Sequence, residues 1–163
     1  MSSDICGQVQ PVPEHLRTVT PRLVVHDGSA AIEFYRAAFG ANELRERFTG
    51  PDGAVIHAEL RIGDAVVMIT EETGDAAPAR PPEALGGHVT SIMATYWEDV
   101  DAIWHRALAA GAEVLFPLAD QFYGERGGRL RDPFGHQWML SQRTELLSHE
   151  EMQRRAARFF SGE

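Results

Sequence analysis

The sequence predicts an α+β fold in which two tandem βαβββ modules form curled mixed sheets around a cavity, followed by a C-terminal helix. Three observations predict it: an internal repeat, amphipathic helical spacing that ends at a glycine in both copies, and short alternating strands between turn signals. The expected segments are an N-terminal tail (1–17), a first module (18–72), a linker (73–87), a second module (88–143) and a C-terminal helix (144–163).

The internal repeat relates segments that lie 71 positions apart. VVHDGSAAIEFYRAAFGANEL has the same layout as TYWEDVDAIWHRALAAGAEVL, so that Gly40 matches Gly111. Much further along the chain the same offset matches Met68 with Met139. A constant offset over about fifty residues is hard to obtain by chance and indicates two copies of one structural unit. Each copy is expected to contain a strand, a helix and three further strands.

The predicted helices have one apolar face and a clear boundary. In the first copy the apolar residues at helical spacing are Ala31, Phe34, Tyr35, Ala38 and Phe39. In the second copy they are Ile103, Ala107 and Leu108. Gly40 and Gly111 follow these sets, where a glycine C-cap is favoured. Ser148 and Glu151 form a capping box that predicts the start of a third, C-terminal helix.

Alternation assigns the side chains of the predicted strands to two faces. Strands are expected over 43–48, 55–62, 65–70, 129–131 and 136–141. The residues expected under the helices are Ile56, Ala58, Leu60, Ile62, Val67, Ile69, Trp138 and Leu140. The opposite face would carry His57, Glu59, Met68 and Met139, and this mixed face is either solvated or the wall of a pocket. Methionines at equivalent positions favour the pocket.

The composition of the 163-residue chain excludes several kinds of chemistry. All 15 basic residues are arginine, which removes Schiff-base and pyridoxal phosphate attachment. Cys6 is the only cysteine, so an internal disulfide and a thiolate-rich metal site are excluded and a reducing, cytoplasmic location is expected. A net charge of −9 disfavours nucleic acid and membrane surfaces as partners. We expect neither a secretory signal nor a membrane span.

Four motifs together resemble the vicinal oxygen chelate superfamily, which includes glyoxalase I, bleomycin-resistance proteins and extradiol dioxygenases. They are SAAIEFYRAAFGA, HAELRIGDAVVMIT, WEDVDAIWHRALAAGA and DQFYGERGGRLRDPFGHQW, and the resemblance covers residues 18–143. The first and last of these regions look most like the PhnB-like branch. The resemblance implies the paired-module fold and a homodimer, because related chains commonly complete their cavities across a two-fold axis.

The resemblance also implies where a metal would bind, with one ligand from the first and one from the last strand of each module. These positions hold Thr20, Met68, Met139 and either Ser91 or, if the second module slips by one residue, Ile92. Such side chains are poor ligands for divalent ions, which prefer imidazole or carboxylate groups. His88 precedes the expected position and would need a bulge to reach it. No metal or other cofactor is therefore expected.

The candidate ligand-binding residues are His57, Glu59, Met68, Trp97, Tyr123, Arg126, Gln137 and Met139. His57 and Glu59 either form an acid–base pair or satisfy each other as a polar pair on the sheet. Tyr123 and Arg126 either close over a ligand, or Arg126 fixes its own loop. We expect Asp132 to be a turn residue. Trp104, on a helix, and Trp138 are expected in the core.

The leading interpretation is a metal-free small-molecule binding protein that sequesters an antibiotic or a metabolite, with an aromatic ligand favoured. Capture needs a pocket and affinity but no reacting group. The competing hypothesis is a metal-independent lyase or isomerase in which His57 and Glu59 act as acid and base. A third hypothesis is an interaction module with a vestigial cavity. The fold alone does not choose among them.

Overall fold

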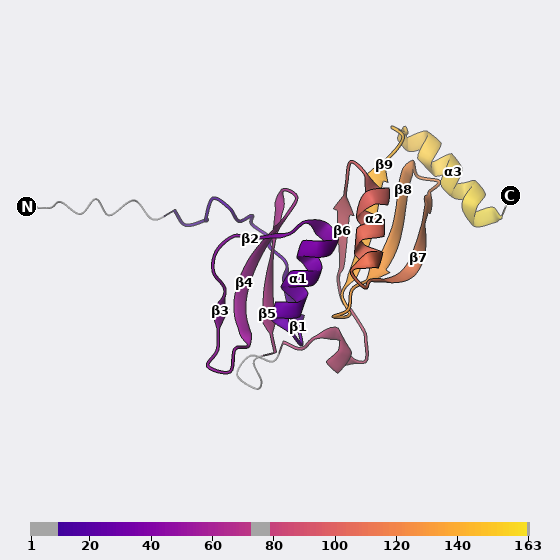
Figure 1. Cartoon of the computed structure of the whole chain (residues 1–163). Coiled ribbons are helices and arrows are strands. Elements are labelled where there is room, and N and C mark those ends of the chain that lie inside the picture. The colour runs from indigo at the N-terminus through magenta and orange to yellow at the C-terminus, as the bar shows by residue number, and fades with distance from the viewer. Residues whose placement is uncertain (1–9, 73–78, 163) are drawn as a thin grey trace, which may run out of the picture.

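The computed structural model describes residues 10–72 and 79–162. Cys6, the first part of the expected N-terminal tail and part of the expected linker lie outside these residues. The predicted α+β fold is confirmed: two βαβββ modules lie next to each other and a helix follows (Figure 1). The first module consists of β1 (Arg22–Val25), α1 (Gly28–Phe39), β2 (Asn42–Glu43), β3 (Phe48–Thr49), β4 (Val55–Ile62) and β5 (Ala65–Glu71).

The second module repeats this order with fuller strands. It consists of β6 (Ile92–Tyr96), α2 (Val100–Ala109), β7 (Glu113–Asp120), β8 (Glu125–Arg131) and β9 (Gln137–Arg143). A short 3₁₀ helix, Pro82–Leu85, precedes it, and α3 (His149–Ser161) follows. The strand orders are β1-β5-β4-β2 and β6-β9-β8-β7, and β3 also pairs with β4. In both sheets the first strand runs parallel to the last one and the other pairs are antiparallel.

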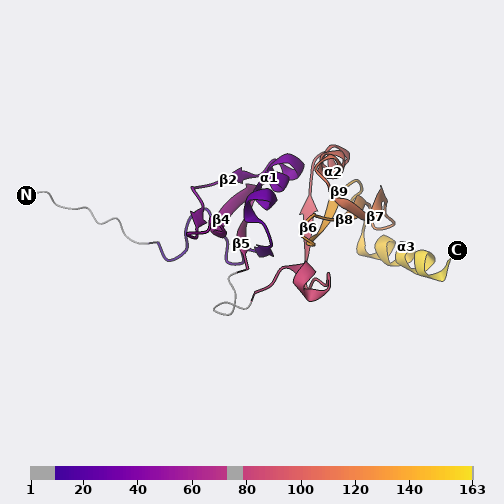
Figure 2. The same ribbon diagram turned by 60° about the horizontal axis from the view of Figure 1, so that its bottom comes forward.

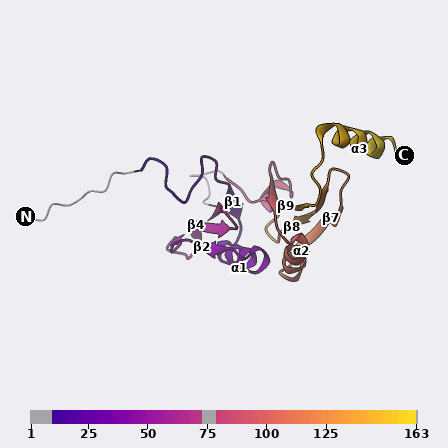
Figure 3. The same cartoon turned by 90° about the horizontal axis from the view of Figure 1, so that it is seen from above.

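Equivalent caps start the helices of the two modules. Asp27 accepts a hydrogen bond from the backbone N–H of Ala30, and Asp99 accepts one from that of Ala102. Gly40 ends α1 in the left-handed region with φ 68°, as the sequence predicts. The two helices pack against each other and lie on the same side of the two sheets (Figure 3).

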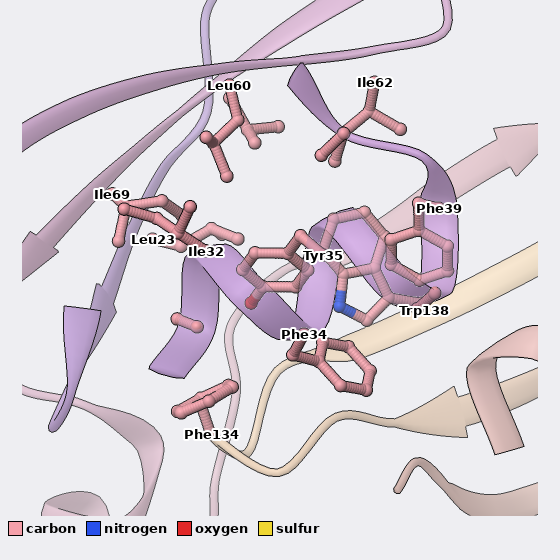
Figure 4. Packing of buried hydrophobic residues seen from close by; sticks show 14 of the residues in the cluster. Leu23, Ile32, Phe34, Tyr35, Phe39, Leu60, Ile62, Ile69, Phe134 and Trp138 are labelled. Atoms are coloured by element: carbon pink, nitrogen blue, oxygen red, sulfur yellow. The ribbon is translucent and has the colours of Figure 1, made fainter. Parts of the chain in front are cut away.

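One aromatic cluster joins the modules (Figure 4). The ring of Trp138 from β9 lies 4.7 Å from that of Phe39 and 5.4 Å from that of Tyr35, both on α1. Trp138 is 2% exposed and Trp104 on α2 is 6% exposed, so the expected core positions of both tryptophans are confirmed. Full burial of each large apolar side chain contributes about 1.5–3 kcal/mol, and here that contribution depends on both modules being in place.

Asp132, in the turn between β8 and β9, lies at the centre of this contact. Its Oδ2 atom accepts hydrogen bonds from the Tyr35 hydroxyl at 2.6 Å and from the Trp138 indole N–H at 2.8 Å. Its Oδ1 atom accepts the backbone N–H groups of Phe134 and His136, both at 2.9 Å. Asp132 is therefore the expected turn residue and also the acceptor that satisfies two buried aromatic donors.

The predicted face of Ile56 is wrong. Ile56 is 44% exposed, whereas Val55 is fully buried. In the pairing of β3 with β4, Phe48 lies opposite His57 but Thr49 lies opposite Val55, so β4 has one extra residue at this point. Such a bulge reverses the alternation of side chains. Beyond the bulge, the buried residues follow the prediction: Ala58, Leu60 and Ile62.

The C-terminal helix α3 lies beyond β7, at the end of the molecule away from the first module (Figure 2). Ser148 accepts a hydrogen bond from the backbone N–H of Glu151, which confirms the predicted cap. The ring of Phe159 stacks on that of Phe122 at 4.7 Å, and no residue of α3 is fully buried. Among the described residues, no helix has the length and apolar character needed to cross a membrane.

Candidate ligand-binding site

Each sheet has one face against its helix and one face turned away from it, which we call the open face. His57 and Glu59 of β4 lie on the open face of the first sheet, while Arg129 of β8 and Met139 of β9 lie on that of the second. Because α1 and α2 lie on the same side of the sheets (Figure 3), both open faces are turned away from the helix layer. A third candidate region is the cavity between the modules.

Glu59 is the centre of a polar cluster on the first open face. His57 Nε2 lies 3.3 Å from Glu59 Oε1, as expected for neighbours on one strand face. His15 Nε2 lies 2.9 Å from Glu59 Oε2, and Arg45 Nε lies 3.2 Å from the same oxygen. The segment around His15 was expected to be a separate tail, but it lies against this face. His15 and Arg45 are far from Glu59 in the sequence, so no local pattern identifies them.

The environment of Glu59 stabilises its charged form. Burial by itself raises the pKa of this carboxyl group, whose side chain is only 7% exposed. Hydrogen bonds with His57 and His15 and the positive charge of Arg45 outweigh burial, so the pKa of Glu59 is below its ordinary value. Both carboxylate oxygens already have partners. This group is therefore a weak proton acceptor at neutral pH, where an effective general base has a pKa closer to 7.

The second open face contains a small pocket of about 180 Å³. Its lining residues are Phe116, Gln121, Tyr123, Gly127, Gly128, Arg129 and Met139. Tyr123 and Met139 are predicted site residues, and burial raises the pKa of the Tyr123 hydroxyl. Arg129 and Phe116 were missed, although Arg129 lies inside the motif that carries the family resemblance. The guanidinium carbon of Arg129 lies 5.1 Å from the centre of the Phe116 ring.

A larger cavity of about 780 Å³ lies between the modules. It is lined by the turn that joins β4 to β5, by β6 and by Pro21 and Trp138. Trp97 also lines it, stacks on Phe39 with ring centres 6.1 Å apart, and donates its indole N–H to the Thr95 hydroxyl at 2.8 Å. The size and the largely apolar walls are typical of sites for small organic molecules.

Arg126 lies on the helix side of β8 and clamps the start of α2. Its Nε and Nη2 atoms donate to the two carboxylate oxygens of Asp101, both at 2.8 Å. These hydrogen bonds raise the pKa of Arg126 above its ordinary value. A bidentate ion pair of this kind fixes the orientation of both side chains. Of the two alternatives for Arg126, the geometry favours the one in which it fixes its own segment.

The predicted site residues do not converge on one pocket. His57, Glu59 and Met68 belong to the first sheet, whereas Met139 and Gln137 belong to the second. Trp97 lines the cavity between the modules. Residues that share a face within each module are therefore predictable from alternation, but their distances across modules depend on how α1 and α2 pack.

The strand registers show how the two modules correspond. Arg22 lies opposite Met68 in the first module, and Ala94 lies opposite Met139 in the second. Met68 and Met139 are 71 positions apart, whereas Arg22 and Ala94 are 72 apart. The first strand of the second module is therefore shifted by one residue relative to the rest of the repeat.

This shift makes Ile92, rather than Ser91, the counterpart of Thr20. The four positions at which the family resemblance implies metal ligands thus hold a threonine, an isoleucine and two methionines. This donor set does not fit a divalent ion, which prefers imidazole or carboxylate ligands. Within residues 10–72 and 79–162, no group of three or more His, Cys, Asp or Glu side chains is arranged to hold a metal ion.

The paired modules define the class of protein. The chain belongs to the Glyoxalase/Bleomycin resistance protein/Dioxygenase superfamily, whose family model matches residues 14–140. It is similar to the uncharacterized protein Rv0887c of Mycobacterium tuberculosis (strain H37Rv), with 44% identity over 137 residues that cover 83% of this chain and 79% of that protein.

Solved structures share the fold. TioX from Micromonospora sp. ML1 has 28% sequence identity and a TM-score of 0.61, and the match covers 76% of this chain and 96% of that one. A PhnB protein from Bacillus cereus, described as a putative 3-demethylubiquinone-9 3-methyltransferase, has 22% identity and a TM-score of 0.56. That match covers 77% of this chain and 99% of the other, and it shows likeness of fold alone.

Proposed function

We propose that the protein binds a small organic molecule, an antibiotic or a metabolite, without a metal and acts by sequestration. The observation that carries the proposal is a 780 Å³ cavity between the modules in a chain whose family ligand positions hold side chains unsuited to a metal. A capture protein needs a cavity and affinity, and both are compatible with the absence of a reacting group. The aromatic rings of Tyr96, Trp97 and Trp138 along this cavity favour an aromatic ligand.

The alternative function is a metal-independent lyase or isomerase that uses His57 and Glu59. The 3.3 Å distance between these side chains favours it. The lowered pKa of Glu59 and the occupation of both its oxygens argue against it, because a proton-transfer group needs a free position near the substrate. Sequestration therefore remains the leading proposal.

The proposal includes a homodimer in the cytoplasm. Large apolar side chains are exposed on strands of both modules, including Phe48 at 62% and Phe116 at 59%. A second copy placed over the open faces would cover such residues and enclose the ligand more completely. The single cysteine fits a reducing compartment.

Thermal denaturation with a panel of aromatic antibiotics and metabolites tests the proposal. At least one compound is expected to stabilise the chelator-treated protein, and a ligand at about 100 times its Kd adds about 2.7 kcal/mol. Ala94→Trp should abolish this shift, because Ala94 is exposed and lines the large cavity. Ala157→Trp, at an exposed position of α3, is the matched control and should leave the shift intact.

Three results would contradict sequestration. One is a panel in which no compound stabilises the protein, and another is an Ala94→Trp variant that responds like the unaltered protein. The third is conversion of a bound compound that His57→Ala abolishes while binding remains, which would establish the lyase or isomerase. A metal assay after purification without chelator should find no bound divalent ion, and one equivalent per chain would contradict the metal-free mode.

A further inference from the structure

Arg129 lacks the partner that comparable arginines of the same strand have. Arg126 pairs with Asp101 at 2.8 Å, and Arg131 pairs with Glu113 at 3.2 Å. Among the described residues, no carboxylate lies within ion-pair distance of Arg129, and its buried Nε atom has no hydrogen-bond acceptor. In a chain with 24 acidic residues, this leaves a cation on the open face without a counter-charge.

An unsatisfied buried donor has an energetic cost that a ligand can remove. A buried polar group without a partner loses its hydration and gains nothing in return, so most such groups in folded proteins are paired. The Ser141 hydroxyl is also buried and has no partner. It lies behind Gly127, since a Cβ atom on Gly127 would come within 3.1 Å of Ser141 Oγ. Arg129 and Gly127 both line the 180 Å³ pocket.

The walls of this pocket suit a flat ring. Phe116 is 59% exposed, and the Arg129 guanidinium packs over it with 5.1 Å between the guanidinium carbon and the ring centre. A guanidinium group held against a ring keeps its N–H donors directed outward in its own plane. Tyr123 and Met139 complete the apolar part of the lining. A pocket of this volume has room for one or two fused aromatic rings.

The nearest acidic side chain does not neutralise Arg129. Glu125 lies near Tyr123 and raises the pKa of that hydroxyl, while Arg129 lowers it. The carboxylate of Glu125 accepts a hydrogen bond from the Tyr96 hydroxyl at 3.1 Å. A ligand carboxylate would therefore meet one cation whose donors are free and one carboxylate that is already engaged.

We infer that this pocket binds a flat aromatic carboxylic acid, with Arg129 as the group that recognises the carboxylate. The rings of Phe116 and Tyr123 would flank the ligand ring, and the guanidinium group would donate to the carboxylate oxygens. The site is distinct from the 780 Å³ cavity, and the inference rests on the proposed binding function only in requiring a small-molecule ligand. It assigns a chemical class and a specificity-determining residue.

Titration calorimetry with two probes of equal shape tests the inference. 2-Naphthoate carries the carboxylate, and 2-naphthamide is its neutral counterpart. We expect the unaltered protein to bind 2-naphthoate at least about tenfold more tightly than 2-naphthamide, because a charge-assisted hydrogen bond contributes more than a neutral one. Arg129→Gln should remove this preference and leave the affinity for 2-naphthamide unchanged. Arg158→Gln, on exposed α3, is the charge-matched control and should retain the preference.

Several outcomes would overturn the inference. They are equal affinity for the two probes, an Arg129→Gln variant that keeps the preference, and no binding of 2-naphthoate at millimolar concentrations. Loss of 2-naphthoate binding in Ala94→Trp would place the probe in the large cavity, so that the inference fails while the proposed function stands. Conversely, binding that depends on Arg129 without any response to the compound panel would support the inference and reject the proposed function. Thermal unfolding of each variant verifies that it is folded.

Discussion

Asp132 joins the two modules through a single carboxylate. Its oxygens accept four hydrogen bonds, and two of the donors are the buried side chains of Tyr35 and Trp138. Sequence reasoning identified the turn, because Asp before Pro is a common turn pair. It did not identify the contact with Tyr35, which is 97 positions away. Local chemistry was thus predictable, and the long-range use of the same side chain was not.

Removing this acceptor should destabilise the whole protein. We expect Asp132→Ala to lower the free energy of unfolding by about 3–5 kcal/mol, because buried donors on Tyr35 and Trp138 lose their partner. Urea denaturation measures the change. Asp52→Ala is the matched control, since Asp52 is an exposed turn residue that accepts only the backbone N–H of Ala54, and its loss should cost about 1 kcal/mol or less. Equal effects of the two substitutions would contradict the role of Asp132.

Glu59 provides a pH-dependent contribution to stability. Its pKa in the folded protein is below the ordinary value, so its contribution is fully present above the unfolded pKa of about 4.3 and is lost as the pH falls through the folded value. Glu59→Gln should lower stability at pH 7 by about 1–3 kcal/mol. The difference from the unaltered protein should shrink below about pH 4. Urea denaturation at several pH values measures it, and a constant difference down to pH 3 would contradict this account.

At the scale of elements, helices were more predictable than strands. Apolar spacing and the caps gave the positions of α1, α2 and α3, since these signals are local. The face of Ile56 was not predictable, because the bulge opposite β3 depends on the pairing of two strands. The contact between His15 and Glu59, 44 positions apart, was missed for the same reason. Alternation therefore predicts a strand face only where the register is uninterrupted.

The packing of α2 on the second sheet depends on a glycine in β8. A Cβ atom on Gly128 would lie 2.7 Å from the ring of Trp104 and 2.9 Å from the backbone nitrogen of Leu118. Gly128→Ala is therefore expected to destabilise the protein by about 1–3 kcal/mol through overpacking. Chemical denaturation of the single and double variants with Trp104→Leu measures the coupling, because the smaller side chain should relieve part of the clash. Additive effects would show that the two residues do not compete for space.

At the scale of the whole molecule, the repeat predicted the fold but not the site. Two copies at a constant offset define two modules, and the family match over residues 14–140 agrees with that reading. The arrangement of the modules depends on contacts such as that of Arg106 on α2, which donates to the backbone carbonyl of Ala37 on α1 at 2.9 Å. The cavity between the modules, and the partnerless Arg129, follow from this packing and from register. Neither leaves a pattern in a single sequence.

The central claim is that the cavity captures an organic ligand without a metal and releases it unchanged. Native mass spectrometry of chelator-treated protein, incubated with a compound that raises its Tm, tests this most directly. We predict a complex whose added mass equals that of the unaltered compound, without a metal ion, and the same compound recovered after long incubation. A required metal ion in the complex, or a recovered compound of changed mass, would contradict the account.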